Sequence, residues 1–86
     1  MTTELSAAHR KTVEELFDHP SSANIEWRRV RSLLEALGSV TEEHNGKLKV
    51  TLGPETEVIQ PPRGKDIDRQ LIVDLRRMLT GAGVVP

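Results

Sequence analysis

A histidine opens a short polar turn in the run EEHNGKLKV, residues 42–50. Histidine titrates near neutral pH, so it can take a proton from a ribose 2′-hydroxyl or give one to a leaving oxygen during RNA cleavage. His44 is therefore the candidate catalytic residue, and a charged Lys47 beside it would steady a phosphate. The alternative is that His44 is only a polar turn residue. His9 and His19 are expected to be solvated surface side chains.

Two lysines extend this candidate site along the following strand. Lys47 and Lys49 alternate with apolar residues, so they share one face of the predicted strand and could contact RNA phosphates there. Glu42 and Glu43 lie across from them in the expected hairpin. Cross-strand ion pairs are therefore the alternative use of the two lysines.

A second basic cluster surrounds the expected start of the last helix. Arg63, Lys65 and Arg69 stand where free backbone N–H groups and the helix dipole already favour an anion. Asp66 and Asp68 dilute this charge, and either could instead cap the helix. This cluster is the best local case for phosphate binding in the sequence.

A third run of charge is expected to have a simpler role. Arg28, Arg29 and Arg31 are predicted to form a solvated face of a helix. Trp27, which precedes them, is expected to pack in the core or between two helices rather than to stack on a base.

Composition limits the classes of function that remain. The 86 residues suit one small domain, 1–86, and the net charge of −1 gives no overall attraction to nucleic acid. The chain has no cysteine, and its acidic residues lack a spacing that gathers three ligands, so neither a metal nor a small-molecule cofactor is expected. There is no apolar run of about 18 residues and no signal-peptide pattern, so we expect a cytoplasmic protein without a membrane segment.

The candidate residues must be positioned by an α+β domain of order α-α-β-β-β-α, with a three-stranded antiparallel sheet packed against helices. Helices are predicted over 4–18, over 25–37, and from Asp66 or Asp68 to Gly81; strands are predicted over 39–43, 47–52 and 57–60. Asn24 is expected to cap the second helix, and Gly38 to end it in a left-handed conformation. The expected core is Ala8, Val13, Leu16, Phe17, Trp27, Val30, Leu33, Leu34, Leu37, Leu48, Val50, Val58, Leu71, Ile72, Leu75, Met78 and Leu79.

The register of the first hairpin follows from burial. A two-residue turn of Asn45 and Gly46 would place Val40 on the lysine face of the sheet. A three-residue turn, 44–46, pairs Val40 with Val50 instead and brings Glu43 opposite Lys47. Because a slip of one residue moves every side chain to the other face, burial favours the three-residue turn, with Gly46 in the left-handed conformation.

This layout, together with three stretches of the sequence, resembles the HicA family of toxins from toxin–antitoxin pairs. The matching stretches are IEWRRVRSLLEALG at 25–38, NGKLKVTLG at 45–53 and RGKDIDRQLIVDLRRMLTGAGV at 63–84. In this comparison 24–82 is the HicA-like core, and 1–20 is an N-terminal helical extension found in one branch of the family.

The resemblance implies a double-stranded-RNA-binding-like fold and an mRNA interferase that cleaves RNA with a histidine. It also implies RNA and a HicB-like antitoxin as partners. The family's histidine follows the glycine of the first hairpin, and the matching position is Leu48. Further histidines are expected after the third strand in this branch, but 59–64 contains none. We therefore expect an RNA-binding protein of interferase ancestry with weak or lost ribonuclease activity. The alternative is a non-catalytic protein-interaction module on the same fold.

Overall fold

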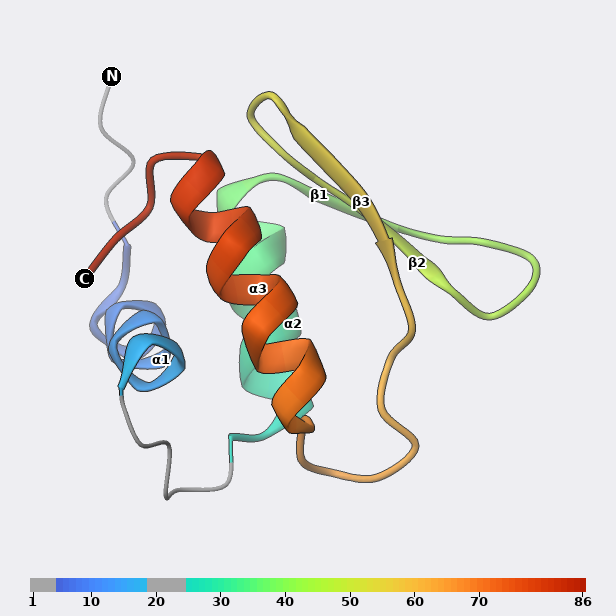
Figure 1. Ribbon diagram of the computed structural model, residues 1–86, viewed down its shortest axis with the longest axis horizontal. Helices are drawn as coiled ribbons and strands as arrows, with labels where there is room; N and C mark the ends of the chain where they lie inside the picture. The colour runs from blue at the N-terminus through green and yellow to red at the C-terminus, as the bar shows by residue number, and fades with distance from the viewer. Residues whose placement is uncertain (1–4, 19–24) are drawn as a thin grey trace.

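A computed structural model describes residues 5–18 and 25–86 of the chain. Within them the fold is α+β, with three helices and an antiparallel sheet of order β1-β2-β3 (Figure 1). This confirms the predicted order α-α-β-β-β-α. The elements are α1 (Ala7–Phe17), α2 (Trp27–Leu37), β1 (Ser39–Glu42), β2 (Leu48–Leu52), β3 (Glu55–Ile59) and α3 (Arg69–Gly81).

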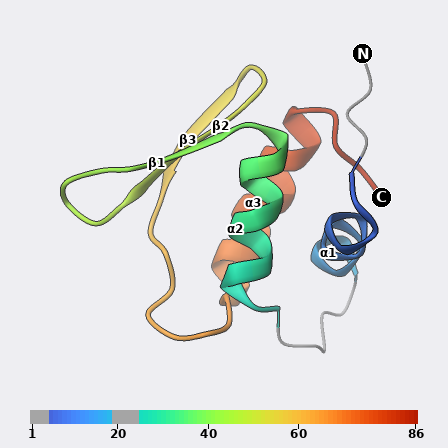
Figure 2. The ribbon, with the colours of Figure 1, turned by 180° about the vertical axis from the view of Figure 1, so that it is seen from behind.

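The elements form layers. In Figure 1, α2 and α3 run in the same direction from the bottom to the top of the view, with the sheet on one side of them and α1 on the other. The view from behind shows the same arrangement (Figure 2). The side chains of β2 alternate between buried and more exposed positions, so α2 and α3 cover one face of the sheet. No element of the described residues covers the opposite face, which we call the outer face. No helix in the described ranges is long and apolar enough to cross a membrane.

Polar side chains set the starts of the first and last helices. Ser6 caps α1 by accepting a hydrogen bond from the backbone N–H of His9 at 3.2 Å. Asp68 caps α3 by accepting one from Leu71 at 2.8 Å, which selects the later of the two predicted caps. Each cap satisfies one of the N–H groups that a helix start leaves without a partner.

The second helix starts later than predicted because the residues before it are paired elsewhere. Asn24 lies outside the described residues, and the N-cap is Glu26, which makes no capping hydrogen bond with its side chain. The backbone of 25–27 instead pairs antiparallel with that of 65–67. The N–H of Trp27 donates to the carbonyl of Lys65 at 2.8 Å, and that of Ile67 to the carbonyl of Ile25 at 3.0 Å. We call this pairing the 26–66 bridge.

The register of the first hairpin is the predicted one. Val40 pairs with Val50, and the N–H of Glu43 donates to the carbonyl of Lys47 at 2.8 Å across the turn. Gly46 has a φ of 86°, the left-handed conformation expected of it. The three-residue turn therefore places Leu48, Val50 and Leu52 against the helices.

The prediction that Val58 is a core residue is wrong. The strand β3 starts at Glu55, and a two-residue turn of Gly53 and Pro54 pairs Leu52 with Glu55. This register puts Val58 beside Lys49 on the outer face, where it is 53% exposed. Ile59, 5% exposed, is the residue of β3 that enters the core.

The predicted end of the second helix needs correction. Gly38 has a φ of −163°, and its importance is steric, since a Cβ there would lie 1.9 Å from the carbonyl oxygen of Thr51 in β2. The last helix ends at Gly81, as predicted, and the left-handed residue that follows it is Gly83, with a φ of 82°. Its N–H donates to the carbonyl of Thr80 and that of Val84 to the carbonyl of Leu79, which is a Schellman ending.

Polar contacts, in addition to apolar packing, hold α1 against α3. The guanidinium of Arg76 in α3 donates to the carbonyls of Leu16 and Asp18 at the end of α1. Thr12 is buried, and Ala8, a predicted core residue, is exposed. The buried apolar residues are Val13, Leu16, Ile25, Val30, Leu33, Leu34, Leu48, Val50, Leu52, Ile59, Ile67, Leu71, Leu75, Met78 and Leu79.

Candidate nucleic-acid interface

His44 lies exposed at the tip of the β1–β2 hairpin. The turn is held by the backbone and by Asn45, whose side-chain oxygen accepts a hydrogen bond from the N–H of Lys47 at 3.1 Å. The imidazole of His44 has no hydrogen-bond partner among the residues described. A ring without a fixed orientation is a poor general base, because catalysis needs a side chain held within roughly 0.5 Å of its productive position.

The position that matches the family's histidine is in the core. Leu48 is 2% exposed, and it pairs with Glu42 on one side and Ile59 on the other. Its side chain faces the helices, so no group at this position can reach a phosphate on the outer face. The described part of the chain therefore places no histidine where the resemblance expects one.

The outer face of the sheet is rich in hydroxyl groups. Thr41, Lys49 and Val58 form one row across the three strands, and Ser39, Thr51 and Thr56 form the next. Lys49 and Lys47 are exposed, and neither forms an ion pair with a described residue, so the cross-strand pairs with Glu42 and Glu43 are not made. Lysine and hydroxyl side chains are typical contacts of the sugar–phosphate backbone.

The second basic cluster is divided between free and paired side chains. Arg63 and Arg69 are exposed and make no ion pair with the described residues. The ammonium of Lys65 lies 3.2 Å from a carboxylate oxygen of Glu26. The carboxylate of Asp68 already accepts a hydrogen bond from the N–H of Leu71 in the first turn of α3, where a phosphate was expected to bind. In Figure 1 the start of α3 lies at the bottom of the view and the tip of the β1–β2 hairpin at its far right, so the two basic sites belong to different parts of the fold.

The arginines of α2 differ in their surroundings. Arg29 lies 2.7 Å from a buried oxygen of Glu15 in α1, although the two groups lack the orientation of a hydrogen bond. Arg31 pairs with Glu35 within the same helix, as expected of a solvated face.

His9 is half-buried rather than fully solvated, because its Nε2 is 2.8 Å from the hydroxyl of Ser32. His19 lies outside the described residues.

A hollow at the 26–66 bridge was not expected from the sequence. It has a volume of about 370 Å³ and is lined by Glu26, Trp27, Arg28, Gly64 and Lys65. Trp27 is half-buried and packs partly against the core, as predicted, and it also lines this hollow. The hollow forms because segments 25–27 and 65–67, far apart in sequence, pair with each other. Neither segment has an alternating pattern that would have predicted this pairing.

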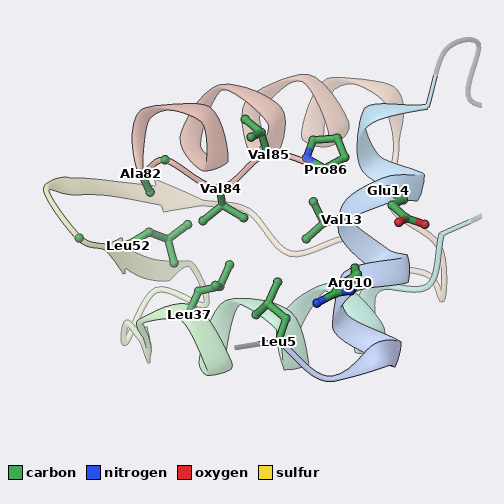
Figure 3. A pocket seen from close by; sticks show the side chains of 12 residues that line it. Leu5, Arg10, Val13, Glu14, Leu37, Leu52, Ala82, Val84, Val85 and Pro86 are labelled. Carbon is green, nitrogen blue, oxygen red and sulfur yellow. The ribbon is translucent and has the colours of Figure 1, made fainter. Parts of the chain in front are cut away.

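A larger pocket of about 640 Å³ lies between α1, the end of α2, the β2–β3 turn and the C-terminal segment. Figure 3 shows Leu5, Leu37, Leu52 and Val84 pointing into it, with Arg10 and Glu14 on the α1 side. The lining offers apolar contacts and no pair of groups suited to acid–base catalysis. The described residues also contain no cluster of three side chains that could hold a metal ion.

Comparisons with known proteins were made for the whole chain. No protein-family model, no curated protein and no solved structure matches it. Functional inference therefore depends on the placement of the side chains described above.

Proposed function

We propose that this chain is an RNA-binding protein of the HicA-like type, with a double-stranded-RNA-binding-like fold and with weak or lost ribonuclease activity. The observation that carries the proposal is the open outer face of the sheet. There Lys49 pairs with Thr41 across the strands and Lys47 lies opposite Glu43, and both lysines are free of ion pairs within the described residues. Such a face suits the phosphates and 2′-hydroxyls by which RNA shape is recognised.

The arrangement of the helices also supports the proposal. Two helices on one face of a three-stranded antiparallel meander, joined in the order helix, three strands, helix, are the layout of double-stranded-RNA-binding domains. Arg63 and Arg69 at the start of α3 would add contacts to a second stretch of phosphates. The role we assign to these residues is to position RNA, not to cleave it.

We propose weak or lost ribonuclease activity because the position expected to carry the catalytic histidine is buried. RNA cleavage by 2′-hydroxyl attack needs a base near pKa 7 within hydrogen-bond reach of that hydroxyl. Leu48 is buried, and His44 is an unsupported side chain at a turn. HicA-like ancestry is therefore proposed for the fold and for RNA binding, without a working catalytic group.

A second candidate function is a non-catalytic module that binds a protein, for instance a HicB-like antitoxin. Val58 favours it, because an apolar side chain that is 53% exposed on the outer face, in the edge strand β3, suits a protein partner better than a phosphate backbone. This alternative predicts that Val58→Lys abolishes binding of the partner protein, and that RNA affinity is absent or unaffected by the lysines.

The test is RNA binding measured by fluorescence anisotropy over a range of salt concentrations. Lys47→Glu combined with Lys49→Glu should weaken binding at least about tenfold and lower the salt slope by about 2, because each lost phosphate contact removes about one unit. Arg10→Glu combined with Lys11→Glu on α1 is the matched control, with the same change of net charge on the other side of the molecule. Equal losses in both double variants, or no RNA binding by the wild type, would contradict the proposal.

A further inference from the structure

The hollow at the 26–66 bridge is a structured site. Residues from the start of α2 form one wall and Gly64 with Lys65 form the other. The two walls are joined by backbone hydrogen bonds of 2.8 and 3.0 Å, so their separation is fixed by the fold rather than by side chains alone. Its volume of about 370 Å³ lies within the range of about 300–1,000 Å³ that is usual for small-molecule pockets.

The lining combines an aromatic surface with charge. Trp27 is the only tryptophan of the chain, and part of its indole is left uncovered by the core. Arg28 and Lys65 carry two positive charges and Glu26 carries one negative charge, so the lining is cationic overall. The side chain of Arg28 is 89% exposed and that of Lys65 is 75% exposed, so both can move toward a ligand.

These features match the chemistry of one unpaired nucleotide. Bases that have left a helix stack on aromatic side chains, and each such stack contributes about 1–3 kcal/mol to binding. The phosphate attached to such a base would find Arg28 and Lys65 at the same hollow. Glu26 already lies 3.2 Å from Lys65 and 3.4 Å from Arg28, so it holds both cations at the hollow when no ligand is bound.

We propose that this hollow binds one unpaired nucleotide of an RNA, with its base against the indole of Trp27 and its phosphate against Arg28 and Lys65. The inference rests on the proposed RNA-binding function and adds a second contact site to the outer face. It places the recognition of a single-stranded end or bulge at the start of α2.

Intrinsic fluorescence tests the proposal directly, because the chain has one tryptophan and no tyrosine. Single-stranded RNA of about six nucleotides should quench the emission of Trp27 in a saturable way. A blunt duplex of the same length should bind without this quenching. Anisotropy of labelled RNA, measured in parallel, reports binding at any site.

Two variants separate the hollow from the fold. Gly64→Leu adds a side chain at a residue that lines the hollow and has open space around it, so it should obstruct the hollow, leave the urea melt unchanged and abolish the quenching. Trp27→Leu removes the stacking surface and should weaken binding of the single-stranded RNA roughly 5- to 150-fold. Arg28→Gln should weaken it as well, whereas Arg31→Gln, the same change on the same helix outside the hollow, should not.

The outcomes distinguish this inference from the proposed function. Single-stranded RNA that binds by anisotropy without altering the emission of Trp27, or that binds Gly64→Leu as tightly as the wild type, overturns the inference and leaves the proposed function standing. If neither fluorescence nor anisotropy detects RNA binding, the inference and the proposed function are both overturned. Saturable quenching that Gly64→Leu abolishes, in a variant that still binds duplex RNA, supports both.

Discussion

His44 shows how little a residue type alone says about catalysis. Its side chain is exposed at the tip of a hairpin, and it makes no hydrogen bond with the described residues. Proton transfer needs such support, since a freely rotating imidazole spends little time in a productive orientation.

We therefore expect His44→Ala to leave RNA decay unchanged. The measurement is cleavage of a labelled RNA by purified protein, with the fold of the variant checked by circular dichroism. Cleavage by the wild type that is lost in a folded His44→Ala variant would show that His44 is catalytic.

The face that a residue occupies matters as much as its type. Leu48 and Lys49 are neighbours in sequence, yet one is 2% exposed and the other is exposed on the outer face. Leu48→His should lower the free energy of unfolding by at least about 2 kcal/mol, because it removes buried apolar volume and buries a polar ring. Lys49→His should change it by less than about 0.5 kcal/mol. Urea melts of the two variants check this, and similar losses in both would mean that the register is different.

At the scale of elements, the 26–66 bridge joins the starts of α2 and α3. The Lys65 ammonium, by hydrogen bonding first and then by its charge, lowers the pKa of Glu26, and Arg28 and Arg29 add to this effect. The ionised carboxylate therefore stabilises the folded state at pH values above its ordinary pKa. This contribution is lost as the pH falls through the lowered value.

Glu26→Gln should accordingly destabilise the protein near neutral pH and make little difference in acid. The measurement is the difference in urea midpoint between wild type and variant at about pH 6 and about pH 3. The effect should be small and should shrink as salt is added, because the ion pair is exposed. A constant difference at both pH values would mean that the carboxylate charge is not involved.

Elements governed by local rules were predictable from the sequence. The cap at Asp68 and the turn at Gly46 each depend on residues close by in the sequence. Elements governed by distant partners were not. The late start of α2 depends on pairing with 65–67. The exposure of Val58 was missed for a local reason, because the third strand was predicted over 57–60, whereas it starts at Glu55, directly after the two-residue turn of Gly53 and Pro54.

For the candidate site, too, features set by local sequence were predictable and long-range contacts were not. The sequence located the exposed lysines and arginines, because charged residues in alternating or helix-flanking positions stay in solvent. It did not predict that Lys65 pairs with Glu26, or that Trp27 lines a hollow, because both contacts join segments almost forty positions apart.

At the scale of the whole molecule, a small number of apolar side chains holds three layers together. Leu75 is fully buried in α3, and α3 contacts both β3 and α1. Leu75→Ala should cost roughly 2–5 kcal/mol, which is a large part of the stability of a domain of this size. Val73, on the same helix but 46% exposed, is the control, and Val73→Ala should cost less than about 0.5 kcal/mol. A loss below about 0.5 kcal/mol for Leu75→Ala in a urea melt would show that the layers are held elsewhere.

The three-residue turn at 44–46 constrains how this sequence can evolve. Point mutations at Lys47 or Lys49 alter the open surface one side chain at a time, and selection can act on each of them separately. Loss or gain of a single codon within the turn would instead exchange the two surfaces of β2, exposing Leu48 and Val50 and burying the lysines. We therefore expect the hairpin to tolerate changes in its exposed side chains more readily than a change in the length of its loop.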